Sequence, residues 1–453
     1  MAVLCGLAAG IALTRQPLAA TGVAICILIF SLAFQHFAGV ERAGFTLLLA
    51  ATLILGYGFA NVGLRGGTPI PAAEMLVVPL ASVALLERDT RLPRRILLPL
   101  LFFALLTAVR LAFDYPVWGA DAVRDSTIPL EALTLAIGYR AVRRDGIEPW
   151  LRRLRIIFLL LLTYSISYPW RGELQSISPT VGLDRPSVPL FGTFGGVNFG
   201  AAAGAVFLAE FLRGWRRFVP ILVLSGLIAI FQARTLYVLF PISLLLLGFL
   251  VRRPVRMVLQ SAGVIVLGLA IVFGFSASLG IEGRKGPVDL SFVTANAGTI
   301  VGEQGPAQGT ITDRAEWARQ SLSMFRQNVG TMAVGVGLGP DLIGGFGSHG
   351  PVRKPHNDYL EILTRMGILG LCLYVWLLVA CIVPIWQMAR KRGGLPSRFC
   401  AWVIAAVVIY LGVSAVQPVM AFPYGTVPVF SFLGMGLAAA ISSQAPKKQL
   451  SRG

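Results

Sequence analysis

Three long uncharged segments constrain the fold of this chain more than any other feature. Residues 257–281, 366–389 and 399–446 contain no Asp, Glu, Lys or Arg. A helix that crosses a bilayer needs roughly 20 mostly apolar residues, so each segment can supply a span, and polar residues within 417–426 divide the last into two. Only 13% of the 453 residues are charged and the mean hydropathy is +0.75. A soluble domain could not cover its surface with this composition, so we expect a membrane protein.

The same apolar pattern recurs along the whole chain, without the alternation of apolar and polar residues that is typical of membrane barrels. It predicts an all-α polytopic membrane protein of about 12–14 transmembrane helices, with residues 1–453 forming a single transmembrane domain. The first apolar run lacks a basic flank and is followed by further spans, so we expect a retained helix rather than a cleaved signal peptide. The predicted spans are 2–14, 18–36, 44–60, 69–86, 96–113, 127–142, 154–169, 194–212, 218–233, 235–251, 257–280, 366–389, 399–417 and 425–442.

The positions of Lys and Arg predict the orientation. Alternate loops carry 24 of the 39 basic residues and six acidic residues, so one side holds the entire formal net charge of +18. Because cytoplasmic loops are enriched in Lys and Arg, we expect both termini in the cytoplasm and the protein in the bacterial inner membrane. The high basic charge is then a topology signal with membrane lipids as partners, and it does not indicate nucleic-acid binding.

Two loops are predicted on the opposite, outer (periplasmic) side. The shorter loop is 170–193. The larger loop, 282–364, is rich in Gly and polar residues and contains no run that could cross a membrane. In it, Thr312 and Asp313 with Glu316 resemble a helix cap, and apolar residues at helical spacing predict a surface helix over 313–327.

One histidine is the strongest candidate for chemistry. His36 lies at a predicted cytoplasmic helix end, where an interfacial role is expected, and His349 lies at a polar loop tip. His356 follows Pro355 and precedes a polar Asn-Asp-Tyr cluster at the start of a span. A neutral imidazole can accept a proton from a hydroxyl near neutral pH. The alternative interpretation of this cluster is helix capping.

Two arginines are candidates for binding an anion. Arg234 stands between two apolar runs at the outer end of a span, where charged groups are costly and often mark a ligand or pathway. Arg314 lies in the first turn of the predicted surface helix, where the helix dipole disfavours a cation unless an anion is near. The alternatives are an arginine that reaches the lipid headgroups and an ordinary solvated side chain.

Four stretches resemble the O-antigen ligase and polymerase superfamily, in the order found there. His356-Asn357, nine residues and then Gly367-Ile-Leu-Gly370 are similar to its His-Asn, nine-residue, Gly-x-x-Gly signature. Phe191 to Asn198 resembles its Gly-x-Phe-Gly-x-x-Asn segment, and Gln232-Ala233-Arg234 resembles its Ser-x-Arg. Arg314 to Trp317 followed by Gly335-Val-Gly-Leu-Gly339 resembles its Arg-Trp helix and Gly-rich turn. The resemblance covers roughly residues 190–440.

The resemblance implies a membrane glycosyltransferase (GT-C-like) fold with an active site at the periplasmic face. The implied donor is a glycan on undecaprenyl diphosphate, and the implied reaction is an inverting, metal-independent transfer without a cofactor. His356 is then the candidate base or acceptor-positioning group, and Arg234 and Arg314 are the candidate diphosphate ligands. Asn198, Asn357 and Tyr359 are expected to shape the site. Few carboxylates that could hold Mg²⁺ occur together, and this agrees with metal independence.

The acceptor is left open by the sequence. O-antigen ligation to the lipid A core is favoured, and the alternative is an O-antigen or exopolysaccharide polymerase. Polymerases carry an Arg, ten-residue, Gly pattern, which Arg171/Gly182, Arg319/Gly330 and Arg326/Gly337 satisfy. A lipid-glycan flippase or transporter is the alternative from another class, but a transporter should place polar residues at mid-membrane, and this chain concentrates them on one side.

Overall fold

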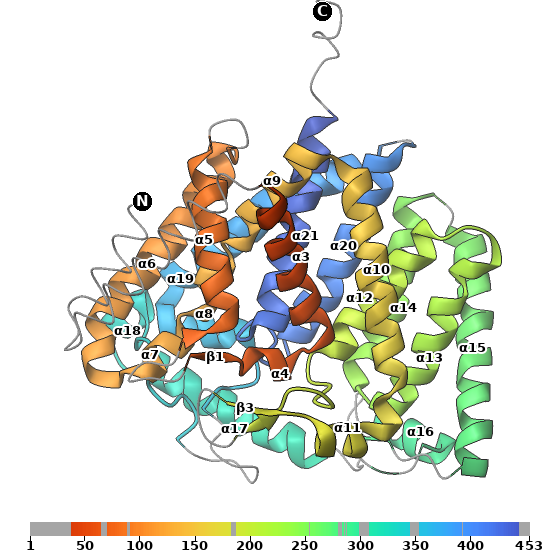
Figure 1. Ribbon diagram of the computed structural model, residues 1–453. Coiled ribbons are helices and arrows are strands. Elements are labelled where there is room, and N and C mark those ends of the chain that lie inside the picture. The colour runs from red at the N-terminus through yellow and green to blue at the C-terminus, as the bar shows by residue number, and fades with distance from the viewer. Residues whose placement is uncertain are drawn as a thin grey trace, which may run out of the picture.

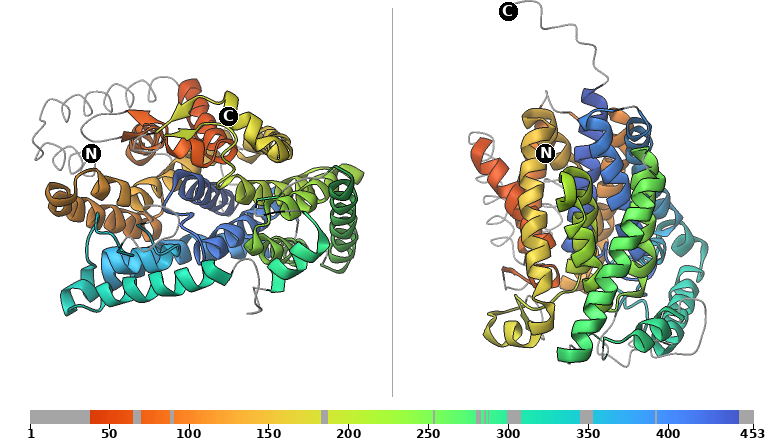
Figure 2. Two further views of the ribbon diagram at one scale, coloured as in Figure 1. Left: turned by 90° about the horizontal axis from the view of Figure 1, so that it is seen from below. Right: turned by 90° about the vertical axis from the view of Figure 1, so that its right-hand side faces the viewer.

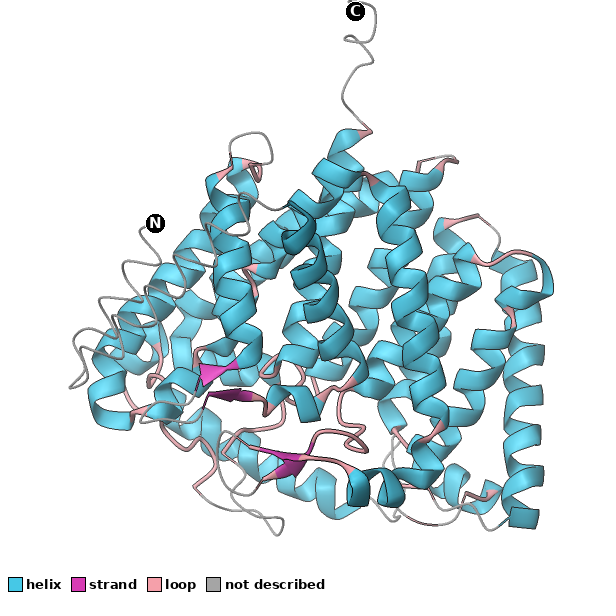
Figure 3. Cartoon of the chain, in the orientation of Figure 1, coloured by secondary structure: helices cyan, strands magenta, loops and turns pink. Residues whose placement is uncertain are grey.

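The computed structural model describes most of the chain, and within it the fold is helical. The described residues are 38–64, 70–87, 91–182, 187–252, 254–279, 283, 284, 286, 288–298, 308–344, 353–391 and 393–443. The predicted spans 2–14 and 18–36 lie outside them, as do His36 and His349. Two short antiparallel hairpins, which the sequence did not predict, are the β-structure in this part of the chain (Figure 3).

Most of the long helices overlap predicted spans, with different boundaries in several cases. The helices are α3 (Ala38–Ile54), α4 (Tyr57–Ala60), α5 (Ala72–Leu86), α6 (Arg94–Trp118), α7 (Ala120–Asp125), α8 (Thr127–Glu131), α9 (Thr134–Asp145), α10 (Ile147–Ile166), α11 (Arg171–Ile177), α12 (Val197–Phe211), α13 (Val219–Phe231), α14 (Arg234–Leu250), α15 (Pro254–Leu279), α16 (Leu290–Gly298), α17 (Gln308–Phe325), α18 (Val329–Val334), α19 (Asp358–Ala389), α20 (Leu395–Ser414) and α21 (Pro423–Ser442). The strands are β1 (Gly63–Leu64), β2 (Ile70–Pro71), β3 (Thr180–Val181) and β4 (Val188–Pro189), and two 3-10 turns are Tyr168–Trp170 and Gly214–Arg217.

Six segments in the described part of the chain are long and apolar enough to cross a membrane. They are Arg94–Trp118, Gly214–Phe231, Leu259–Ser276, Asp358–Ala389, Leu395–Ser414 and Pro423–Ser442, and Ala72–Leu86, Val197–Phe211 and Arg234–Leu250 are shorter apolar helices. These elements confirm the prediction of an all-α polytopic membrane protein. The total of 12–14 spans remains a prediction.

Several predicted helix boundaries were wrong, and α10, for example, begins at Ile147 instead of 154. The helix predicted from 366 begins at Asp358, because Asp358, Glu361 and Arg365 find buried partners and apolarity is not required there. The span predicted at 127–142 is divided into α8 and α9. The surface helix predicted at 313–327 begins a turn earlier, at Gln308, so Thr312 and Asp313 lie inside α17 instead of capping it.

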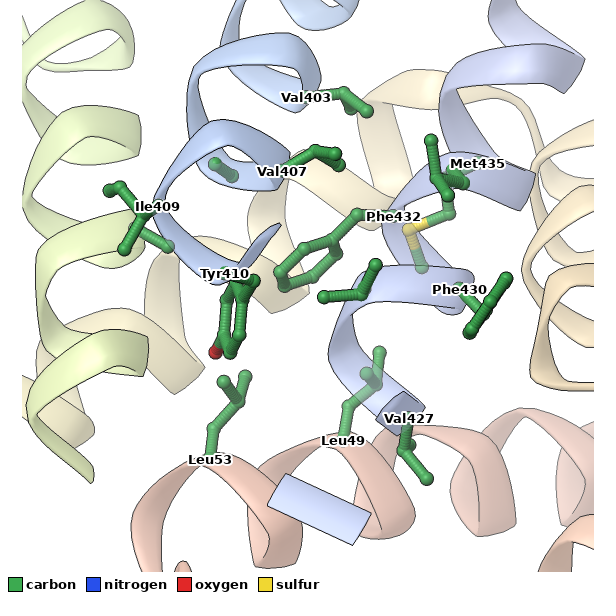
Figure 4. Packing of buried hydrophobic residues seen from close by; sticks show 14 of the residues in the cluster. Leu49, Leu53, Val403, Val407, Ile409, Tyr410, Val427, Phe430, Phe432 and Met435 are labelled. Carbon is green, nitrogen blue, oxygen red and sulfur yellow. The ribbon is translucent and has the colours of Figure 1, made fainter. Parts of the chain in front are cut away.

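The core is built around α21, which packs against α3, α9, α19 and α20. Figure 4 shows side chains of α3, α20 and α21 interleaving, among them Leu53, Tyr410 and Phe432. A glycine on each of two facing helices allows α9 and α21 to approach closely. A Cβ added at Gly138 would lie 2.3 Å from the Ser431 carbonyl oxygen, and one at Gly434 would lie 2.1 Å from that of Leu135. Small residues at such crossings are typical of helix pairs in membranes.

Large apolar side chains are exposed along the outer helices. They include Phe102 and Phe113 on α6, Val266 and Phe275 on α15, and Trp376 and Val379 on α19. Helix α15 stands at the edge of the bundle (Figure 2). An apolar exposed belt of this kind suits contact with lipid tails.

The two predicted outer loops meet at one end of the bundle. Figure 1 shows α11, β3, α16 and α17 along that end, whereas the α9–α10 junction, with its Arg cluster, lies at the other. Helix α17 packs against α18 and α19. The loop end is therefore where residues from both outer loops and from the ends of several spans can meet.

Candidate functional site

His356 sits in a short loop at the entrance to α19. Its backbone is left-handed, with φ = 53°, which is unusual for a residue other than glycine. Its Nδ1 lies 3.1 Å from the carbonyl oxygen of Lys354. Because a carbonyl oxygen can only accept a hydrogen bond, Nδ1 carries the hydrogen and the neutral ring keeps its lone pair on Nε2. The side chain is thus held in the tautomer that can accept a proton at Nε2.

The electrostatic surroundings favour that neutral form. Burial lowers the pKa of the His356 imidazole, and the charge of Arg314 lowers it further. The hydrogen bond to Lys354 and the Glu361 carboxylate raise the pKa, but the net shift is downward. A base with a lowered pKa is unprotonated over a wider pH range.

Helix α17 brings Trp317 and Arg314 to His356. The Trp317 and His356 rings have centroids 4.8 Å apart and planes inclined by 35°. Trp317 is buried against Leu342 and Ile343. Since residues three apart lie on the same face of a helix, anchoring Trp317 also brings Arg314 toward the histidine. This spacing gives a physical reason for the Arg-x-x-Trp sequence.

Arg234 and Arg314 approach each other from different helices. Arg234 begins α14 two residues after Gln232, whose left-handed backbone (φ = 51°) ends α13. Burial lowers the pKa of the Arg314 guanidinium, and the nearby charges of Arg234 and Arg284 lower it further. The structure therefore gathers His356, Arg314 and Arg234 at the loop end, and it adds Arg284, which the sequence did not single out.

The other three predicted site residues make structural hydrogen bonds. The Asn357 side chain caps α19 by accepting from the Leu360 backbone N–H (3.0 Å), and the Tyr359 hydroxyl donates to the Leu411 carbonyl of α20 (3.0 Å). Asn198 is buried in the first turn of α12, and its Oδ1 accepts from Phe199 N–H (3.0 Å). The Tyr359 bond joins α19 to α20, whereas the bonds of Asn357 and Asn198 are local to the starts of α19 and α12. Direct roles of these residues in substrate binding remain predictions.

A buried ionic network, which the sequence did not predict, involves residues on both sides of His356 in the chain. Arg365 Nη1 lies 2.8 Å from Asp125 Oδ2, and its Nε lies 3.1 Å from Glu361 Oε1. Lys354 Nζ lies 3.1 Å from Glu361 Oε1 and 3.7 Å from Asp125 Oδ1. The network ties the backbone on both sides of His356 to α7 and α19. Charged residues close to the ends of predicted spans could have indicated this network, because charged groups are buried only when they are paired.

The Gly-rich turn is held against this network. Gly335, Gly337 and Gly339 have φ of 79°, 103° and 108°, a region that favours glycine. The Gly339 N–H donates to Asp125 Oδ2 (2.9 Å), and the Gly337 N–H donates to the Arg365 carbonyl (3.1 Å). The three glycines of the predicted motif therefore let the turn pass close to α6 and α19.

The spacing between His356 and Gly367 also has a structural basis. Gly367 interrupts the helical geometry of α19 with φ = 67°, and a Cβ there would lie 2.3 Å from the Ala333 carbonyl oxygen of α18. The nine intervening residues form the polar first turns of α19. The signature thus combines the histidine, its helix cap and the kink where α18 docks.

The segment from Phe191 to Asn198 lies beside α13, where Phe194 is near Phe231. Phe194 stacks on Tyr164 and meets Tyr168 edge-on, with ring centroids 4.9 Å apart in both pairs. Gly196 (φ = 84°) lies against the Tyr424 ring, where a Cβ would be 2.2 Å from a ring carbon. The segment therefore packs the shorter outer loop onto the ends of α10 and α21.

No group of three or more His, Cys, Asp or Glu side chains in the described ranges is arranged to hold a metal ion. The metal independence of the reaction remains a prediction.

Comparison with protein families finds a match to part of the chain. No curated protein matches the chain. A family model described as O-Antigen ligase matches residues 219–375, a range that contains Arg234, Arg314 and His356 but not Asn198. This match supports the assignment of the chain, a multi-pass bacterial membrane protein, to the O-antigen ligase superfamily.

Proposed function

We propose that the protein transfers a glycan from undecaprenyl diphosphate to a hydroxyl acceptor at the periplasmic face, and that the acceptor is the lipid A core. Family membership supports a glycosyltransferase of the O-antigen ligase or polymerase type. The observation that carries the proposal is the neutral His356, with Nε2 available, beside a group of arginines.

The geometry suits an inverting displacement. The acceptor oxygen forms a bond to the anomeric carbon while His356 Nε2 takes the hydroxyl proton. The bond from that carbon to the diphosphate oxygen breaks, and the electron pair leaves with undecaprenyl diphosphate. Arg234 and Arg314 stabilise the negative charge that develops on the leaving group through charge-assisted hydrogen bonds. In this mechanism no metal or cofactor takes part.

Replacement of the base tests the proposal. General base catalysis contributes typically about 10²–10⁴-fold to a rate, so His356→Ala should abolish detectable glycan transfer in a complementation assay at an unchanged protein level. Full activity in that variant would remove His356 from the mechanism. Arg319→Ala is a matched control, because the Arg319 side chain is 74% exposed and pairs with Glu316.

Lipopolysaccharide from a deletion strain distinguishes ligase from polymerase. A core that lacks all polymer indicates a ligase, whereas a core that carries one repeat indicates a polymerase. Transfer by the purified protein in detergent excludes the flippase alternative, because transport forms no new glycosidic bond.

A further inference from the structure

A short loop after α15 is fixed to the backbone that precedes Arg234. The Arg284 backbone N–H donates to the Ile230 carbonyl oxygen (3.2 Å). The Gln232 side chain donates through Nε2 to the Gly286 carbonyl oxygen (3.1 Å), and the Gly283 N–H closes the loop on that same oxygen (2.8 Å). These hydrogen bonds attach the Arg284 loop to the turn at Gln232, directly before α14.

Contact between Gly283 and this turn is close. A Cβ added to Gly283 would lie 2.4 Å from Gln232 Nε2 and 3.0 Å from the Ile230 carbonyl oxygen. A larger residue would push the loop, and Arg284 with it, away from Arg234. The loop and the Gln232–Arg234 motif thus form one structural unit.

Arg171, from the shorter outer loop, holds the same segment from the other side. Its Nη2 donates to the Gly283 carbonyl oxygen (3.2 Å), and its guanidinium lies over the Tyr168 ring, 4.9 Å from the centroid. Because Arg171 begins α11, this bond ties the 170–193 loop to the 282–364 loop directly beside Arg284.

The side chain of Arg284 adds a further positive charge to the arginine group. It is exposed, and its charge acts on both Arg314 and Arg234. Within the described ranges, no ion pair to an acidic side chain involves Arg284 or Arg314. Like charges held together by the backbone are unfavourable in isolation, and a bound anion with several acceptor oxygens relieves the repulsion.

We infer that Arg284 is a third phosphate ligand for the lipid diphosphate donor and that Arg171 is a positioning residue that holds the Arg284 loop in place. The inference rests on the proposed function, since it assigns further residues to the same donor site. Three guanidinium groups from α14, the loop after α15 and α17 can surround two phosphoryl groups, whereas a monophosphate leaves one guanidinium without a partner.

Binding to purified full-length protein in detergent tests this assignment, with undecaprenyl diphosphate and undecaprenyl monophosphate as probes. Arg284→Gln should weaken diphosphate binding by about tenfold, which corresponds to the loss of one charge-assisted bond. It should weaken monophosphate binding less, so the preference for diphosphate falls. Arg284→Lys keeps the charge and should lose less affinity than Arg284→Gln. Arg319→Gln, on the exposed face of α17, should change neither affinity.

The role of Arg171 is tested through its dependence on Arg284. Arg171→Gln should reduce the same diphosphate preference, and Arg171→Gln combined with Arg284→Gln should bind no more weakly than Arg284→Gln alone. Additive losses would show that Arg171 does not act through Arg284. An unchanged affinity in Arg284→Gln, with weakened binding in Arg234→Gln, would overturn the role of Arg284 but leave the proposed donor site in place. If Arg234→Gln and Arg314→Gln also bind normally, the proposed donor site itself is wrong.

Discussion

The Trp317 indole lies against the His356 imidazole, with ring centroids 4.8 Å apart. The contact shields the imidazole from water, and burial is the largest cause that lowers the pKa of His356. Trp317→Ala should therefore raise that pKa, so the acidic limb of the pH–rate profile moves to higher pH. Trp317→Phe keeps an aromatic cover and should leave the limb almost in place. Identical profiles for both variants and the parent protein would contradict this account.

Arg314 is predicted to influence both the pH profile and donor binding. Its positive charge lowers the pKa of His356, so Arg314→Gln removes one cause of the downward shift and the pKa rises. Because the neutral imidazole is the active form, activity should then be lost at a higher pH as the solution is acidified. The same variant should bind undecaprenyl diphosphate about tenfold more weakly or worse. An acidic limb at the same pH as in the parent protein would show that Arg314 does not influence the pKa of His356.

Asp125 is predicted to be essential for the stability of the site. Its side chain is fully buried, forms an ion pair with Arg365 Nη1 (2.8 Å) and accepts a hydrogen bond from Gly339 N–H (2.9 Å). Removing one partner of a buried ion pair costs about 3–5 kcal/mol, so Asp125→Asn should lower the thermal unfolding temperature markedly in detergent. Glu316→Gln, which breaks the exposed pair with Arg319, should cost about 1 kcal/mol or less. Equal effects of the two changes would argue against the buried network.

Gly367 is predicted to tolerate no side chain. Its φ is 67°, and a Cβ would lie 2.3 Å from the Ala333 carbonyl oxygen. Gly367→Ala should destabilise the protein by about 1–3 kcal/mol through backbone strain alone, and the clash with α18 adds to the loss. Gly263→Ala in α15 is the matched control, because nothing lies within 4 Å of a Cβ there. This substitution should be neutral or slightly stabilising. Unfolding temperatures measured in one detergent compare the two variants, and a stable Gly367→Ala protein would show that α19 does not need the kink.

Much of the helical architecture follows from apolarity, which is a local property. In the part of the chain that the structure describes, the long uncharged runs form helices, and Arg-rich turns join several of them. The prediction was wrong where polar residues join a helix. Asp358 and Arg365 belong to α19 because each has a partner outside that helix, the Met420 N–H and Asp125, and an apolarity pattern contains no information about partners.

The candidate site was predictable only in part, because only some of its residues stand out from their local sequence. His356, Arg234 and Arg314 stand out locally, as an unusual residue or a charge at a span end. Arg284 and Asp125 do not, since an arginine in a polar loop and an aspartate near a helix end are common. Arg284 stands out only in the structure, where hydrogen bonds join Arg284 and Gly286 to Ile230 and Gln232.

Apolarity and motif order in the sequence are enough to indicate a membrane protein with two long polar loops, and a histidine that follows an arginine-bearing helix in the order typical of the O-antigen ligase superfamily. Apolar runs and charge placement suffice for this, because the bilayer imposes the same condition on every segment. Which residues come into contact depends on the packing of the helices and loops. Trp317 reaches His356, Arg171 reaches the loop of Arg284, and Asp125 reaches Arg365, because backbone hydrogen bonds and glycine contacts fix how distant segments pack.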